Sequence, residues 1–124
     1  MKKTLKERLI NLLKNGEIEK FNRYRKFTKY KEVDLSYSNL SYSDLSDSDL
    51  YNSDLSGSDL DFASITLSCS ILKMKTCEKI RKQFMFHTLS LMKHADNLTN
   101  KEKEIFEFCK DYANEFHRTD VEKL

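Results

Sequence analysis

One spacing dominates this sequence of 124 residues: from residue 35 onward a leucine returns at every fifth position. An α-helix repeats apolar residues at a period of about 3.6 and a β-strand at a period of about 2, so a period of five fits neither. The members of the series are Leu35, Leu40, Leu45, Leu50, Leu55 and Leu60, and Ile65 continues it. A repeat this regular predicts a repeated architecture before it predicts any single motif.

The positions around each leucine are also constrained. The residue before it is aspartate or asparagine, and the residue two before it is small from the second unit on. We expect the leucine to fill an interior, the small residue to lie where two walls approach, and the other three positions to face water. This arrangement requires a chain that turns a corner every five residues.

The units "SNLSY", "SDLSD", "SDLYN" and "SDLSG" resemble the pentapeptide-repeat family, and the resemblance covers residues 33–67. It implies a mixed β-solenoid and α fold, with a short right-handed quadrilateral β-helix of under two coils and four units per coil. Residues twenty positions apart would then stack at about the 4.8 Å spacing of paired strands. Tyr42 would stack on Phe62, and Asp34 would lie under Asp54.

Helical patterns flank the repeat, so we expect three segments: an N-terminal helical cap with a basic arm over 1–32, the repeat over 33–67, and a C-terminal helical hairpin over 68–124. The helices are expected over Thr4–Lys14, Glu17–Lys26 and Thr76–Ala95, and after a Thr99/Glu102 capping box. The predicted apolar stripe of the third helix consists of Ile80, Phe84, Thr88, Leu91, Met92 and Ala95. Since a short repeat array has open ends, these helices are expected to cover them.

Charge is spread unevenly along the chain. Residues 1–32 hold 11 basic and 4 acidic side chains, residues 33–67 hold 7 aspartates and no basic residue, and residues 68–124 hold 11 basic and 9 acidic side chains. The chain therefore has a basic arm, an acidic middle and a nearly neutral tail. Such asymmetry predicts charged partners.

The acidic repeat is the first candidate binding surface. Its candidate partner-binding residues are Asp34, Asp44, Asp49, Asp54 and Asp59. Calcium is not expected there, because an EF-hand loop needs a glutamate at its end and residues 33–67 contain none. Members of the resembled family imitate duplex DNA and occupy DNA gyrase, which implies that a smaller DNA mimic is one use for this surface.

The arm "KFNRYRKFTKYK" is the second candidate. It carries six basic residues and an aromatic residue at every third position, namely Phe21, Tyr24, Phe27 and Tyr30. Basic surfaces with stacking aromatics suit single-stranded nucleic acid. Arg23, Arg25, Lys26 and Lys29 are its candidate contact residues. In the alternative interpretation, Phe21, Phe27 and Tyr24 fill the open end of the first coil, and the basic side chains are a solvated face.

No enzyme, cofactor or metal site is expected. His87 and His94 lie seven residues apart, but a zinc site needs about four ligands in a tetrahedral array. Three cysteines without a CxxC motif favour reduced thiols, and no apolar run approaches the length of a membrane span, so we expect a cytoplasmic protein that contacts no membrane.

The layout is similar to that of small phage and prophage proteins, which implies an accessory role in a host cell. The leading hypothesis is a non-enzymatic inhibitor, anti-CRISPR-like, that contacts a host nucleic-acid enzyme or defence nuclease through its charged surface. One alternative is a direct nucleic-acid-binding protein that uses residues 20–31, and another is a structural or assembly protein. A homodimer is a further hypothesis, because the tail carries many phenylalanines.

Overall fold

The fold was described from a computed structural model, in which residues 2–124 are placed. The chain divides into two compact units, with the boundary between Cys77 and Glu78. The first holds two helices and the repeat, and the second holds two further helices.

The first unit begins with two helices of ten residues each, α1 (Leu5–Lys14) and α2 (Ile18–Phe27). Thr4 caps α1 and forms a reciprocal capping box with Glu7. Gly16 follows α1 with φ 74°, the left-handed conformation typical of a residue that closes a helix. The sequence places both helices within one or two residues of these bounds.

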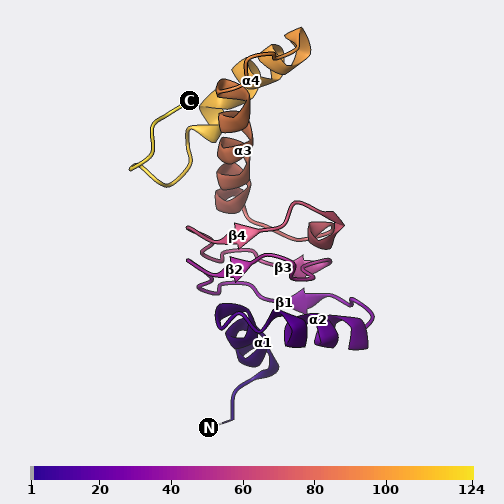
Figure 1. The fold of residues 1–124 in the computed structure, drawn as a ribbon. Coiled ribbons are helices and arrows are strands. Elements are labelled where there is room, and N and C mark those ends of the chain that lie inside the picture. Colours follow the sequence, from indigo (N-terminus) through magenta and orange to yellow (C-terminus); the bar gives the residue numbers. More distant parts are fainter. Residues whose placement is uncertain (1) are drawn as a thin grey trace. The chain divides into compact units, whose positions relative to one another are not determined.

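The repeat pairs with itself in parallel at an offset of twenty residues. Strands β1 (Val33–Asp34) and β3 (Ser53–Asp54) form one two-stranded sheet, and β2 (Asp44–Leu45) and β4 (Ser64–Ile65) form another. Val33 pairs with Ser53, and Asp44 pairs with Ser64. The two sheets lie on opposite sides of the repeat (Figure 1). The expected stacking of Tyr42 on Phe62 is confirmed, with ring centroids 4.8 Å apart and planes at 14°.

A hydrogen-bonded turn explains the period of five. The amide of the small residue donates to the carbonyl of the leucine three residues earlier, for example Ser48 to Leu45 at 3.1 Å and Ser58 to Leu55 at 3.1 Å. The third residue of the turn has a positive φ, as in a type II turn. These corner residues are Tyr37, Tyr42, Asp47, Asn52, Gly57 and Phe62.

The interior of the repeat is a column of leucines. Leu35, Leu40, Leu50 and Leu55 have no exposed surface, and Leu45 and Leu60 are buried. Buried serines fill the small position, and several of them donate a hydroxyl to the leucine carbonyl of the same turn, as Ser38 does to Leu35 at 2.7 Å. The hydroxyl is thereby satisfied locally, so serine can occupy a buried position without a penalty for an unpaired group.

The first unit continues ten residues beyond the expected end of the repeat. After a short 3-10 helix, Cys69–Ile71, the chain returns to the repeat, where Lys75 bridges in parallel to Asp54. The Leu55 amide donates to the Lys75 carbonyl at 2.8 Å, and the Lys75 amide donates to the Ser53 carbonyl at 2.8 Å. Residues 68–77 therefore add backbone pairing to the repeat, although they lack its sequence pattern.

The second unit consists of α3 (Glu78–Lys93) and α4 (Asn100–Ala113). The predicted Thr99/Glu102 capping box is present at the start of α4. The core of this unit is formed by Phe86, Leu89, Ala113 and Phe116. The expected stripe is wrong at Thr88, Leu91 and Ala95, which are exposed, and Leu91 is 74% exposed.

Candidate functional site

The five candidate aspartates are spread over several sides of the repeat. Asp34 and Asp54 face each other in the β1–β3 sheet, whereas Asp44 lies in the β2–β4 sheet. Asp59 is bridged to Asn39, outside both sheets, and Asp49 follows β2. Asp34 and Asp44 are exposed, and the other three are half-buried. These residues are acidic in sum but do not gather on one sheet face.

The repeat aspartates also hold the turns. In Asp34, Asp44, Asp54 and Asp59 the carboxylate accepts the amide hydrogen of the residue two positions later, as Asp34 does from Ser36 at 2.9 Å and Asp54 does from Ser56 at 2.9 Å. Asn39 makes the same bond to Ser41 at 3.1 Å with a neutral oxygen. This requirement for a short side-chain acceptor accounts for the aspartate or asparagine before five of the six leucines, the exception being Asp49 before Leu50.

Hydrogen bonding favours the ionised form of these carboxylates. Bonds from Ser36, with a smaller contribution from Lys6, hold the pKa of Asp34 below its usual value. Bonds from Ser46 and Ser64 do the same for the pKa of Asp44. Both groups therefore carry full negative charge at neutral pH.

Arg25, one of the four expected contact residues of the basic arm, is a structural residue. It is 1% exposed, and its guanidinium donates to the carbonyls of Asp49 at 3.2 Å, Lys31 at 2.6 Å and Tyr51. Burial lowers the pKa of Arg25 from its usual value. The expectation that Arg25 faces a partner is thus corrected: its charge is enclosed between α2 and the repeat.

Asn22 forms a second anchor between α2 and the repeat. Its side-chain amide donates to the Asp47 carbonyl at 2.8 Å and accepts from the Asp49 amide at 2.8 Å. Arg25 lies three residues further along the helix. Together the two side chains form hydrogen bonds with backbone groups of the repeat that α2 covers. This role of Asn22 was not predicted from the sequence. The signal that could have revealed it is a polar pair beside the buried Phe21.

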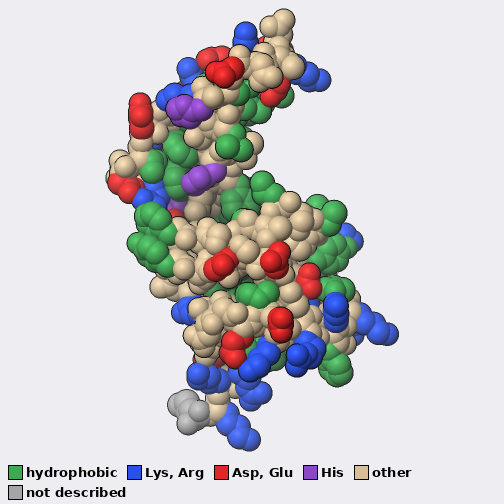
Figure 2. Space-filling model, viewed as in Figure 1, with side chains coloured by type: hydrophobic (Ala, Val, Ile, Leu, Met, Phe, Trp, Pro, Cys, Tyr) green, Lys and Arg blue, Asp and Glu red, His purple; other side chains and the backbone are tan. Residues whose placement is uncertain are grey.

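The remaining basic candidates share the solvent side of α2 and its end. Arg23, Lys26 and Lys29 are exposed, and across residues 2–124 none of the three forms an ion pair. We call these three residues together with Phe27 the basic surface. Lys20 lies beside it but is paired with Glu17 at 2.9 Å. Figure 2 shows lysine and arginine side chains gathered over α1 and α2 and acidic side chains over the repeat.

Phe27 contradicts the expectation that it plugs the first coil. It is 86% exposed, whereas Phe21 on the same helix has no exposed surface. Its ring borders a shallow hollow that is also lined by Lys20, Arg23 and Tyr24, and a second hollow is lined by Glu19, Asn22, Arg23 and Lys26. Arg23 borders both hollows, so it stands at the centre of the basic surface.

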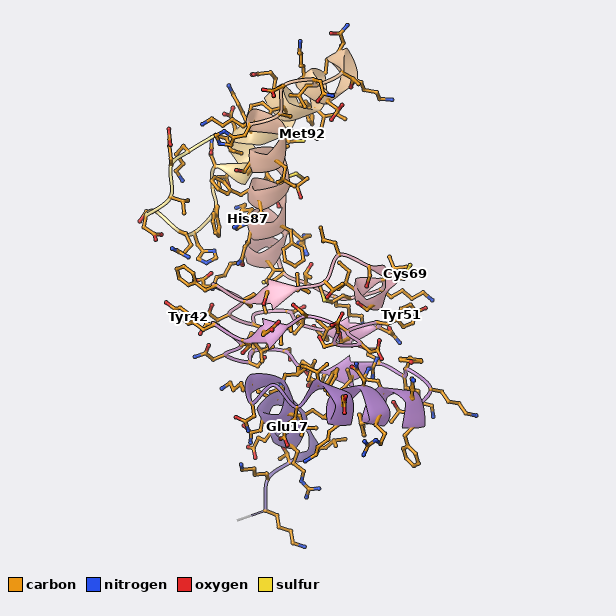
Figure 3. All side chains as sticks on the ribbon, viewed as in Figure 1. Glu17, Tyr42, Tyr51, Cys69, His87 and Met92 are labelled. Carbon is orange, nitrogen blue, oxygen red and sulfur yellow. The ribbon has the colours of Figure 1, made fainter. Side chains whose placement is uncertain are left out.

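Other chemistry receives no support from the geometry. Within residues 2–124 no three histidine, cysteine or acidic side chains form a cluster that could hold a metal ion. Within the described residues Cys69 and Cys109 form no disulfide bond, and Figure 3 marks Cys69 in the first unit and His87 on α3 of the second unit. None of the described helices has the length and apolar character needed to cross a bilayer.

A backbone that turns every five residues and pairs with itself in parallel twenty residues later defines a repeat protein. Residues 31–65 match the family model described as pentapeptide repeats, in eight copies. Residues 31–65 are therefore a run of pentapeptide repeats, and the resemblance seen in this part of the sequence is confirmed. Searches of curated proteins and of solved structures give no significant match.

Proposed function

We propose that this protein is a non-enzymatic binding protein in which the repeat is a rigid support and the basic surface contacts a nucleic acid. The observation that carries the proposal is the contrast between two sets of side chains on α2. Arg25 and Asn22 bond the helix to the repeat, whereas Arg23 and Lys26 are exposed and form no ion pair within residues 2–124. A helix held in this way presents its cations without the ordering cost that a flexible arm would incur.

We infer that the support is a right-handed quadrilateral β-helix with helices over its first end. The twenty-residue pairing, the turn every five residues and the column of leucines all support this geometry. Such a structure keeps the surface on α2 in a fixed position, because α2 is bonded to its first coil at two residues. A crystal structure showing four sides per coil tests the inference, and a left-handed or three-sided coil contradicts it.

Electrostatics predicts how the nucleic-acid contact behaves. Each phosphate neutralised by lysine or arginine releases counterions, so binding weakens linearly on a log–log scale, with a slope of about 0.7 per contact for a single strand. In fluorescence anisotropy at increasing salt, we expect the wild-type protein to bind short oligonucleotides with such a slope. Arg23→Gln with Lys26→Gln should reduce the slope by about 1 to 2 and weaken binding at least tenfold.

A matched control comes from the second unit. Lys101 and Lys103 on α4 are also exposed, so Lys101→Gln with Lys103→Gln removes the same charge from another surface. This variant should bind as the wild type does. Equal losses in the two double variants would show only an effect of net charge, and the absence of any binding would refute the proposed function.

The inhibitor hypothesis remains a second candidate, because the repeat carries seven aspartates and no basic residue. A host nucleic-acid enzyme with a basic groove, including a phage-targeting nuclease, is the partner of this kind that it predicts. Its test differs from the first: Asp34→Asn with Asp44→Asn should abolish capture of such an enzyme, while Arg23→Gln with Lys26→Gln should not. The reverse result would contradict inhibition through the acidic repeat.

A further inference from the structure

Phe27 is an exposed apolar side chain on a helix whose other phenylalanine is buried. Its ring is 86% exposed at the last position of α2, and no aromatic or cation–π partner is recorded for it within residues 2–124. Burial of a phenylalanine contributes about 1.5–3 kcal/mol, so leaving the ring in water forgoes that stabilisation. An aromatic residue on this helix can be buried, as Phe21 shows.

The neighbours of Phe27 indicate what the ring is placed to meet. The hollow that it borders has cations at Lys20 and Arg23 and a second aromatic ring at Tyr24. Arg23 and Phe27 are four residues apart on α2, about 6 Å along the helix axis and on the same side of it. A chain that alternates phosphates with flat bases would thus meet a guanidinium and a phenyl ring in succession.

We propose that the basic surface takes single-stranded rather than duplex nucleic acid, and that Phe27 is the platform on which a base stacks. This inference rests on the proposed function and names its ligand class. In a duplex the base faces are already stacked on one another, so an exposed phenyl ring gains contact with a base only from an unpaired strand. The cations serve both ligands, because both carry phosphates.

The decisive comparison uses the full chain with a fluorescent oligothymidylate and a duplex of the same length. We expect the wild type to bind the oligothymidylate about tenfold or more tightly than the duplex. Phe27→Ser should weaken single-strand binding about five- to a hundredfold, the range that follows from one lost base stack, and should change duplex binding by less than about twofold. Because Phe27 is exposed, the variant should keep the thermal midpoint of the wild type.

Phe108→Ser is the matched control, since Phe108 is 89% exposed on α4 in the other unit. It removes an equally exposed ring from outside the basic surface and should leave both affinities unchanged. Equal affinity for the two ligands, or an undiminished single-strand affinity in Phe27→Ser, would overturn the stacking proposal and leave nucleic-acid binding itself intact. No binding of either ligand would instead refute the proposed function.

A lipid surface is the competing occupant, because an exposed phenylalanine beside lysines also suits an anionic bilayer. Vesicles of phosphatidylserine and phosphatidylcholine test it directly. The stacking proposal expects weak vesicle binding that the oligothymidylate displaces. Tight vesicle binding that Phe27→Ser abolishes and the oligothymidylate does not displace would overturn it.

Discussion

Gly57 is the only glycine among the corner residues of the repeat, and its neighbour Tyr37 explains why. A Cβ built on Gly57 would lie 2.5 Å from two ring carbons of Tyr37, which is twenty positions earlier in the pairing register. Other corners, such as Tyr42 and Asn52, accept a side chain in the same left-handed conformation. The limit at Gly57 is therefore contact across the coil as well as backbone strain.

This contact gives a prediction with a built-in control. Gly57→Ala should lower the free energy of unfolding by about 1–2 kcal/mol from left-handed strain, with a further loss from the displaced ring. Gly16→Ala has a similar φ of 74° but nothing within 4 Å of its new Cβ, so it should show the strain alone. Adding Tyr37→Ser to Gly57→Ala should remove the extra loss in the free energy of unfolding, measured by denaturant unfolding. Equal losses in Gly57→Ala and Gly16→Ala would contradict the clash with Tyr37.

The turn carboxylates predict a dependence of stability on pH. The folded-state pKa values of Asp34 and Asp44 lie below their usual values, so their contribution is present above the unfolded pKa of about 3.9 and is lost as pH falls through the folded pKa. Asp34→Asn with Asp44→Asn should keep the turns, because Asn39 already makes this bond. Calorimetry should show a smaller fall in thermal midpoint below about pH 4 for this variant than for the wild type.

An unchanged pH response in that double variant would show that the acid sensitivity comes from other groups. Asp34→Ala with Asp44→Ala serves as the comparison, since alanine removes the acceptor of the turn as well as the charge. It should be less stable than the asparagine variant at neutral pH. The sequence predicted these aspartates as solvated outer residues, which their exposure fits, but not their hydrogen bonds, because an Asx turn depends on a backbone conformation that spacing alone does not specify.

At the scale of elements, the regular spacing of aromatic residues in α2 led to a wrong prediction of which side chains are buried. Aromatic residues recur every third position, yet a helix advances about 100° per residue, so Phe21 and Phe27 lie on different sides. The buried side instead holds Phe21 and Arg25, which are four residues apart. Nothing in the sequence distinguishes Arg25 from the basic residues around it. Its burial is evident only in the fold, where its guanidinium donates to three carbonyls.

Arg25 should therefore dominate the stability of the junction between α2 and the repeat. Arg25→Leu leaves buried carbonyls without a donor, and we expect a loss of about 3 kcal/mol or more in the free energy of unfolding. Arg23→Leu on the same helix changes an exposed residue and should stay within about 0.5 kcal/mol of the wild type. Chemical denaturation decides between them, and similar midpoints for the two variants would refute the role of Arg25.

The element that sequence described least well is α3. Its apolar residues include Phe84, Met85, Phe86, Leu89 and Leu91, which surround much of the helix. Because these residues form no single stripe, the sequence does not show which side of α3 is buried. In the fold, Phe86 and Leu89 pack with Ala113 and Phe116. Helix ends were easier to predict, because a capping box such as Thr99 with Glu102 is local in sequence.

At the scale of the whole molecule, the division after Cys77 predicts which fragments fold. A fragment of residues 1–77 keeps α1, α2 and the bridge from Asp54 to Lys75, so it should unfold cooperatively. A fragment of residues 33–67 lacks Asn22, Arg25 and that bridge, and its open ends should leave it unfolded. Circular dichroism on heating separates the two cases, and a cooperative melt of the shorter fragment would show that the flanking segments are dispensable.

The register of twenty residues constrains how the gene encoding this chain can change. A deletion or insertion of five residues keeps the rhythm of leucines but places every later residue opposite a different partner, so that Asp44 would no longer meet Ser64 and Tyr42 would no longer meet Phe62. A tandem duplication of twenty residues keeps both pairings. Length variants of this protein that arise by duplication should therefore survive mainly in steps of one full register, and the same rule sets the step for lengthening the repeat by design.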